Sequence, residues 1–109
     1  MEDKKFLETA LQKITSFREA VLNDIPDSMD KRKLLGYIDE AILGLKNSKK
    51  VNNKTFINLE KFYQSSSMLI GLSTLRLEGV CYLTWRDYDK FHFDNVKPNL
   101  KLYGNVFLM

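Results

Sequence analysis

The stretch TLRLEGVCYLTWRDYDKFHFDN, residues 74–95, decides the fold class, because its side chains fit two different periodicities. Between Leu75 and Trp85, apolar or small residues alternate with mostly polar or β-branched ones, and Phe91 and Phe93 alternate with polar neighbours. A period of two is typical of half-buried strands, and the polar residues between the runs favour turns. This pattern predicts an antiparallel β-meander of three or four strands, with Trp85, Phe91 and Phe93 packed against helices.

The same stretch also fits a helix, because several of its apolar and aromatic residues recur at spacings of three and four. These residues are Trp85, Tyr88, Phe91, His92 and Val96. In this alternative Thr84 caps the start of the helix and Pro98 lies beyond its end. The chain would then be an all-α four-helix bundle with an extended C-terminal tail. Of the two interpretations, we favour the meander.

Upstream of this stretch, residues 1–67 predict three helices from apolar stripes with helical spacing. Pro26 ends the first helix, because the residue before a proline is pushed out of the helical region. Asp27 or Ser28 caps the second helix, and Ser65–Ser67 weaken the third. The stripes contain Phe6, Leu7, Ala10, Leu11, Ile14, Phe17, Val21 and Leu22, then Leu34, Leu35, Ile38, Ala41, Ile42 and Leu45, then Phe56, Leu59, Phe62 and Tyr63.

Together these patterns predict an α+β fold in one domain, residues 1–109, with a helical part of about 1–67 and a sheet part of about 68–109. The chain has 109 residues, of which 44% are hydrophobic, enough for one core without metals or disulfides. The charged start, MEDKKFLETA, does not resemble a secretory signal, and the apolar runs are far shorter than the ~20 residues of a membrane helix. We therefore expect a cytoplasmic protein that does not enter a membrane.

Few residues in the sequence suit catalysis or metal binding. Cys81 and His92 are the only thiol and imidazole, and the meander points their side chains to opposite faces, so they cannot form a nucleophile–base pair. Asp87, Asp89 and Asp94 surround His92, but their spacing matches no known cation-binding loop, and polar turns explain them. We predict no catalytic residue, no metal site and no cofactor, and we expect that the protein is not an enzyme.

Nucleic-acid binding is the alternative function that the lysines suggest. Lys31, Arg32 and Lys33 lie near the start of the second helix, where cations oppose the helix dipole, and Lys49, Lys50 and Lys54 form a second cluster. The net charge of +3 is small, and Asp27 and Asp30 can pair with the first cluster. The candidate phosphate contacts are five of these basic residues: Lys31, Arg32, Lys33, Lys49 and Lys50.

Protein binding is the function that we favour. Trp85, Tyr88, Tyr103 and Phe107 are the candidate anchors if they prove exposed, since aromatic residues dominate interface energies. A sheet edge or a C-terminal strand could also pair with a second copy as a homodimer. The general plan of a small, lysine-rich, partly helical chain is similar to that of bacteriocin immunity proteins and small phage-encoded inhibitors, although no motif carries the comparison. We expect a small regulator, inhibitor or immunity-type factor that occludes a surface of its partner.

Overall fold

The part of the chain that the structure describes forms four long helices and one short helix, and it contains no strand. This computed structural model describes residues 2–73 and 75–100. The helices are α1 (Asp3–Asp24), α2 (Met29–Lys46), α3 (Asn53–Leu72), α4 (Gly79–Asn95) and the short α5 (Lys97–Leu100). The meander prediction was therefore wrong. The all-helical alternative is correct over this part, and its extended tail falls on residues 101–109, which lie outside the described residues.

The three N-terminal helices begin and end at residues that favour such boundaries. Ile25, held extended before Pro26, ends α1. Ser28 caps α2 by accepting a hydrogen bond from the Lys31 amide at 3.0 Å. Asn52 opens α3 as a capping box, in which its side chain and that of Thr55 each accept from the other's backbone amide.

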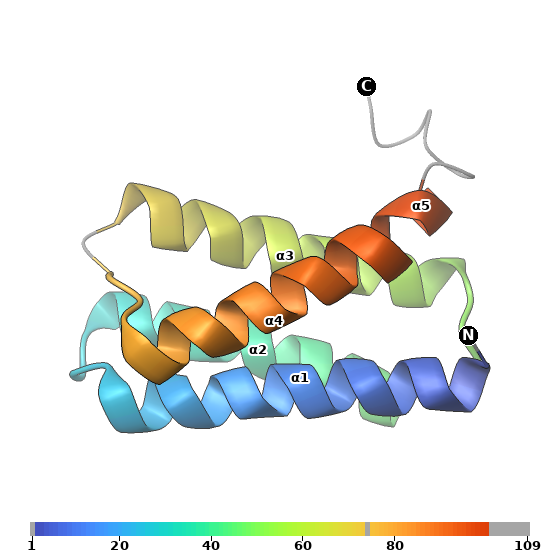
Figure 1. Cartoon of the computed structure of the whole chain (residues 1–109), viewed down its shortest axis with the longest axis horizontal. Coiled ribbons are helices and arrows are strands. Elements are labelled where there is room, and N and C mark those ends of the chain that lie inside the picture. Colours follow the sequence, from blue (N-terminus) through green and yellow to red (C-terminus); the bar gives the residue numbers. More distant parts are fainter. Residues whose placement is uncertain (1, 74, 101–109) are drawn as a thin grey trace.

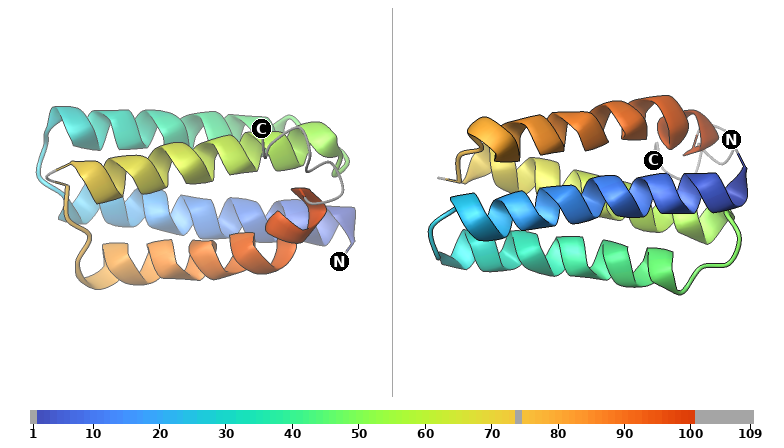
Figure 2. Two further views of the ribbon diagram at one scale, coloured as in Figure 1. Left: turned by 90° about the horizontal axis from the view of Figure 1, so that it is seen from above. Right: turned by 60° about the horizontal axis from the view of Figure 1, so that its bottom comes forward.

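Successive helices run in opposite directions, as the short connections between them require (Figure 1). α1 packs against both α2 and α4, and α2 packs against α3. α4 crosses the bundle obliquely, and α5 continues from its C-terminal end onto α3 (Figures 1 and 2). None of the described helices combines the length and the apolar character that crossing a membrane would need.

The region expected to form strands is helical for two reasons. α3 continues through its three serines to Leu72, because Ser66 lies on the buried face of the helix and packing outweighs its weak intrinsic preference. The chain then turns at Gly79, whose φ of +54° is unfavourable for residues with a side chain. From Gly79 onward, one face of α4 is buried. That face carries Cys81, Trp85, Tyr88, Phe91 and His92.

Several side chains consequently point differently from the prediction. Phe93, expected in the core, is 71% exposed, whereas His92, expected to face away from the core, is completely buried. Thr84 is not an N-cap: it lies inside α4, and its hydroxyl donates to the carbonyl of Val80 at 2.8 Å. Since the described residues contain no strand, they offer no sheet edge for a homodimer, and the proposed C-terminal strand lies outside them.

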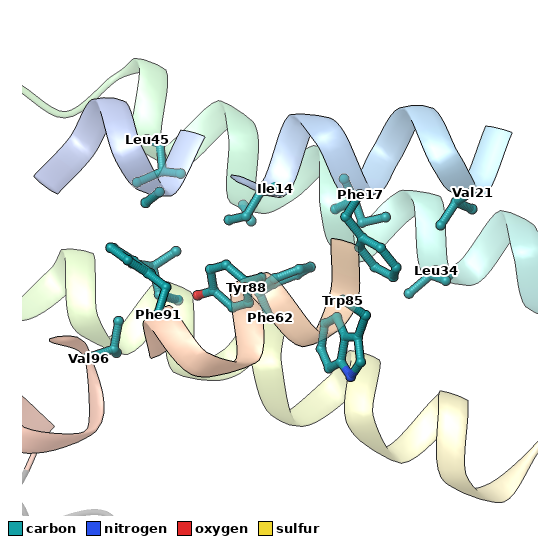
Figure 3. Close-up of a cluster of buried hydrophobic side chains, with 14 of the residues drawn as sticks. Ile14, Phe17, Val21, Leu34, Leu45, Phe62, Trp85, Tyr88, Phe91 and Val96 are labelled. Carbon is teal, nitrogen blue, oxygen red and sulfur yellow. The ribbon is translucent and has the colours of Figure 1, made fainter. Parts of the chain in front are cut away.

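Aromatic side chains fill the centre of the bundle (Figure 3). The rings of Phe17 on α1 and Trp85 on α4 lie 5.1 Å apart, centroid to centroid. Phe62 on α3 meets Tyr88 edge to face at 5.3 Å, and Tyr88 in turn contacts Phe91 at 5.9 Å. This cluster ties α4 to both of the helices that flank it.

Candidate functional site

A chain of hydrogen-bonded polar side chains crosses the buried interface between α3 and α4. The Nε2 atom of His92 lies 2.7 Å from Oε1 of Glu60, and its Nδ1 atom lies 2.9 Å from the hydroxyl of Tyr88. All three residues are buried. Tyr88 and His92 are one helical turn apart, so α4 aligns them, while α3 presents Glu60 from the opposite side.

The second carboxylate oxygen of Glu60 is held by two further donors. Lys97 donates to Oε2 at 2.9 Å from the first residue of α5, and Gln64 donates to the same atom at 2.6 Å. Glu60 therefore joins α3, α4 and α5 through one side chain. We call Tyr88, His92, Glu60, Gln64 and Lys97 the polar chain.

The geometry defines the protonation of this chain. Burial, and then the nearby Glu60 carboxylate, raise the pKa of Tyr88 well above its ordinary value. The hydroxyl therefore stays protonated and donates a hydrogen bond to Nδ1. The Nε2 atom of His92 must then carry hydrogen and donate to Glu60. Burial lowers the pKa of His92, against the opposing effect of Glu60, which is consistent with a neutral imidazole.

Glu60 is the charged member inside the core. Burial by itself raises the pKa of Glu60, but hydrogen bonds from His92, Lys97 and Gln64 outweigh it, so the pKa lies below its ordinary value. The carboxylate is consequently ionised at neutral pH and is balanced by the half-exposed ammonium group of Lys97. An ionised carboxylate in this position needs all of these donors, since a buried charge without partners is costly.

An aromatic stack lies beside the polar chain. The Tyr63 ring is nearly parallel to the His92 ring, with centroids 4.2 Å apart, and also stacks on Trp85 at 5.7 Å. The Tyr63 hydroxyl donates to Asp89 at 2.6 Å, and Lys97 lies 5.4 Å above the ring. Burial, together with the Asp89 carboxylate, raises the pKa of Tyr63 to about 12.

The arrangement orients an imidazole between a phenol and a carboxylate, but these atoms are sealed from solvent. None of the grooves found on the described surface is lined by Glu60, His92 or Tyr88. The polar chain therefore acts on the fold: it sets the spacing of α3 and α4 and holds α5 in place. The sequence analysis missed Glu60, although a single carboxylate flanked by the stripe residues Leu59 and Tyr63 was the available signal.

The structure does not bring together the residues considered for catalysis and metal binding. Cys81 and His92 share the buried face of α4, but eleven positions place them about 16 Å apart along the helix. Burial and the Asp24 carboxylate raise the pKa of the Cys81 thiol, which makes it less reactive. Asp87 pairs with Lys13, and Asp89 accepts from Tyr63. Within residues 2–73 and 75–100, no group of three acidic, histidine or cysteine side chains could hold a metal ion.

The five candidate phosphate contacts fall into two sets with different surroundings. Lys31 donates to the carbonyls of Ile25 and Leu22 at 2.6 and 3.1 Å, so it caps the end of α1. Arg32 pairs with Asp27 at 2.8 Å. These contacts explain why cations occur at the start of α2. Lys33, Lys49 and Lys50 are exposed, the last two at the opposite end of the bundle.

The four candidate protein anchors are not brought together on the described surface. Trp85 and Tyr88 are core residues, so the condition of exposure is not met for them. Tyr103 and Phe107 lie outside the described residues.

The described surface exposes large aliphatic side chains in place of the predicted aromatic anchors, and most of them lie at one end of the bundle. At this end α1 and α3 finish and α2 and α4 begin. Only two large aliphatic side chains, Leu43 and Ile57, are exposed at the opposite end of the described bundle. We call the first group the apolar end; it comprises Leu22, Met29, Met68, Leu72, Val80 and Leu83.

A groove between α2 and α3 opens at the apolar end. Its volume is about 400 Å³, and exposed Met68 and Leu72 line it together with Tyr37, Leu69 and Lys33. Comparison with protein-family models, with curated proteins and with solved structures found no match.

Proposed function

We propose that the protein is a non-enzymatic binding module that occludes a surface of another protein, as a small regulator, inhibitor or immunity-type factor. The observation that carries the proposal is the concentration of exposed aliphatic side chains at the apolar end, contributed by all four long helices. Met68 and Leu72 adjoin in one groove, and exposed apolar side chains that adjoin in this way are typical of surfaces that become covered. The proposal places the protein in the cytoplasm.

The groove between α2 and α3 is the proposed centre of this surface. Met68, Leu69 and Leu72 follow one another at spacings of one, three and four along α3, and Tyr37 faces them from α2. The apolar side chains of this groove, flanked by the polar Gln64, Ser65 and Ser73, suit the apolar face of an amphipathic partner helix. Lys33 at its edge would remain solvated and steer an acidic partner.

A charge placed in the groove tests this proposal. Met68→Glu puts a carboxylate among the apolar side chains, while Leu43→Glu makes the same change at a similarly exposed position of the other end, 61% against 64%. Tagged wild-type and variant chains are expressed in the source cells, and the co-purifying proteins are quantified. A partner retained by wild type and Leu43→Glu but lost from Met68→Glu supports the proposal. Equal loss from both variants, or no retained protein, contradicts it.

Self-association must be separated from binding to another protein. Sedimentation equilibrium of the pure chain reports whether a second copy covers the groove. We expect a monomer, and a dimer that dissociates with Met68→Glu would instead make the partner a second copy of the chain.

A further inference from the structure

The connection between α2 and α3 concentrates positive charge. Residues 41–59 contain four lysines and no aspartate or glutamate, so this short stretch alone exceeds the net charge of the chain, +3. All four lysines are exposed, and none forms an ion pair with a described residue. We call this set the basic patch: Lys46, Lys49, Lys50 and Lys54.

Helix electrostatics accounts for only part of the basic patch. Lys46 lies in the last turn of α2, where a cation is favourable. Lys54 lies in the first turn of α3, which contains no acidic residue, so its charge has the same sign as the helix end. The charge of Lys54 therefore lowers the stability of α3, at a position where many helices carry a carboxylate. No described residue compensates this cost through an ion pair, whereas on α2 Lys31 donates to carbonyls at the end of α1 and Arg32 pairs with Asp27.

A groove runs through the basic patch, lined mostly by polar residues but also by the exposed Leu43. Its volume is about 630 Å³, and Lys49, Lys50 and Lys54 line it together with Asn47 and Asn58. The side-chain amides of these two asparagines have no hydrogen-bond partner among the described residues, so their N–H groups remain available. Two carboxylates lie close to the basic patch. Glu40 lines the groove, and Asp3 accepts a hydrogen bond from the backbone amide of Val51 at 3.1 Å.

From this combination we propose that the basic patch binds the phosphodiester backbone of nucleic acid without sequence preference. Ammonium groups neutralise phosphates and release their counterions, and amide N–H groups donate to phosphate oxygens. An anionic membrane surface would present the same charge. It is the poorer fit, because membrane-binding surfaces combine cations with apolar side chains, and here most exposed aliphatic residues are at the opposite end.

The proposal goes beyond protein binding at the apolar end and does not depend on it. It also differs from the five contacts expected from sequence, because Lys31 and Arg32 have structural partners, whereas Lys46 joins the cluster of Lys49, Lys50 and Lys54. The two ends of the bundle would then contact different classes of macromolecule.

Salt dependence measured with the full chain tests the proposal. Fluorescence anisotropy with a labelled mixed-sequence DNA duplex measures affinity as salt rises. For four phosphate contacts we expect a loss of roughly 100-fold between about 50 and 200 mM salt, which is a log–log slope of about −3.6. The variant Lys49→Gln with Lys50→Gln should bind more weakly, and its slope should be smaller by about 2.

A matched control removes the same charge elsewhere. Lys61→Gln with Lys90→Gln changes two exposed lysines outside the basic patch and should leave the slope near the wild-type value. Circular dichroism confirms that both double variants are folded. Equal losses in the two double variants, or no binding to duplex DNA and single-stranded RNA at low salt, would overturn the proposal. Binding to phosphatidylserine vesicles but not to nucleic acid would overturn it in favour of a membrane.

Discussion

α4 is held by two interfaces that both pack aromatic rings but differ in their buried polar contacts. Against α1 it packs closely, through rings such as Phe17 on Trp85 and Phe6 on Phe91, and the ion pair of Lys13 with Asp87 lies at the solvent edge. Against α3 it places a neutral imidazole on an ionised carboxylate. Apolar contacts tolerate small shifts, whereas the polar chain has one arrangement that satisfies every donor and acceptor. We infer that the α1 interface supplies most of the stability and the α3 interface fixes the position of α4.

The largest expected effect is the loss of a ring from the α1 interface. Phe17→Ala should lower the free energy of unfolding by about 3–5 kcal/mol, because Phe17 is fully buried and its removal leaves a cavity. Phe93→Ala also removes a phenyl ring, but from an exposed position, and should change the free energy of unfolding by less than about 0.5 kcal/mol. Urea unfolding measures both. Similar losses would mean that the helical face of α4 is not the one described.

Glu60→Ala should be the next largest change, at about 2–3 kcal/mol, because the His92 N–H loses its acceptor inside the core. Glu60→Gln restores an acceptor without the charge and should recover part of that loss. Urea unfolding at neutral pH compares the two variants. If Glu60→Ala were harmless, the polar chain would not position α4.

The α3 interface should also make stability depend on pH, whereas the apolar contacts with α1 should not. The pKa of His92 is lowered by folding, so below its ordinary value of 6.5 the unfolded chain binds a proton that the folded chain does not. Stability therefore falls as pH falls through this range, by at most about 1.4 kcal/mol per pH unit for one group. The lowered pKa of Glu60 adds a second loss at lower pH. His92→Gln should remove the first loss and leave the second, in urea unfolding across a pH series.

Tyr63→Phe tests the edge of the α3 interface. It removes the hydroxyl that donates to Asp89 but keeps the stacked ring, so we expect a loss of about 1 kcal/mol. In the wild type, the increase in tyrosinate absorbance from Tyr63 should have its midpoint near pH 12, because its pKa is raised to about 12. A titration in the ordinary range would show that this side chain is not buried against His92.

The smallest effect should come from the ion pair of Lys13 and Asp87, which joins α1 to α4 at the surface. Asp87 is more than half exposed, so a double-mutant cycle with alanine at both positions should give a coupling of less than about 1 kcal/mol. The coupling should weaken further at high salt. A larger coupling energy would mean that contacts with α1 also help to fix the position of α4.

The helical N-terminal part of the fold was predictable because its signals are local. The apolar stripes of residues 1–67 were correctly assigned to three helices, and Pro26 and Ser28 mark a boundary that the structure confirms. The third helix extends past Ser65–Ser67 to Leu72, since burial of Ser66 depends on neighbouring helices that the local sequence does not reveal. The polar chain was not predicted, because Glu60 and His92 are 32 positions apart and nothing local joins them.

By itself, the sequence determined that residues 1–67 form three amphipathic helices. For residues 74–95 the sequence allowed both the strand period of two and the helical spacing of three and four. A spacing of four, as between Cys81 and Trp85, places side chains on one face of a strand and also on one face of a helix. Only the tertiary structure decided between them. A helix buries His92 and exposes Phe93, and this is favourable because α3 supplies Glu60 as the partner of the imidazole, whereas a strand would have buried the ring of Phe93 and left Glu60 without that donor.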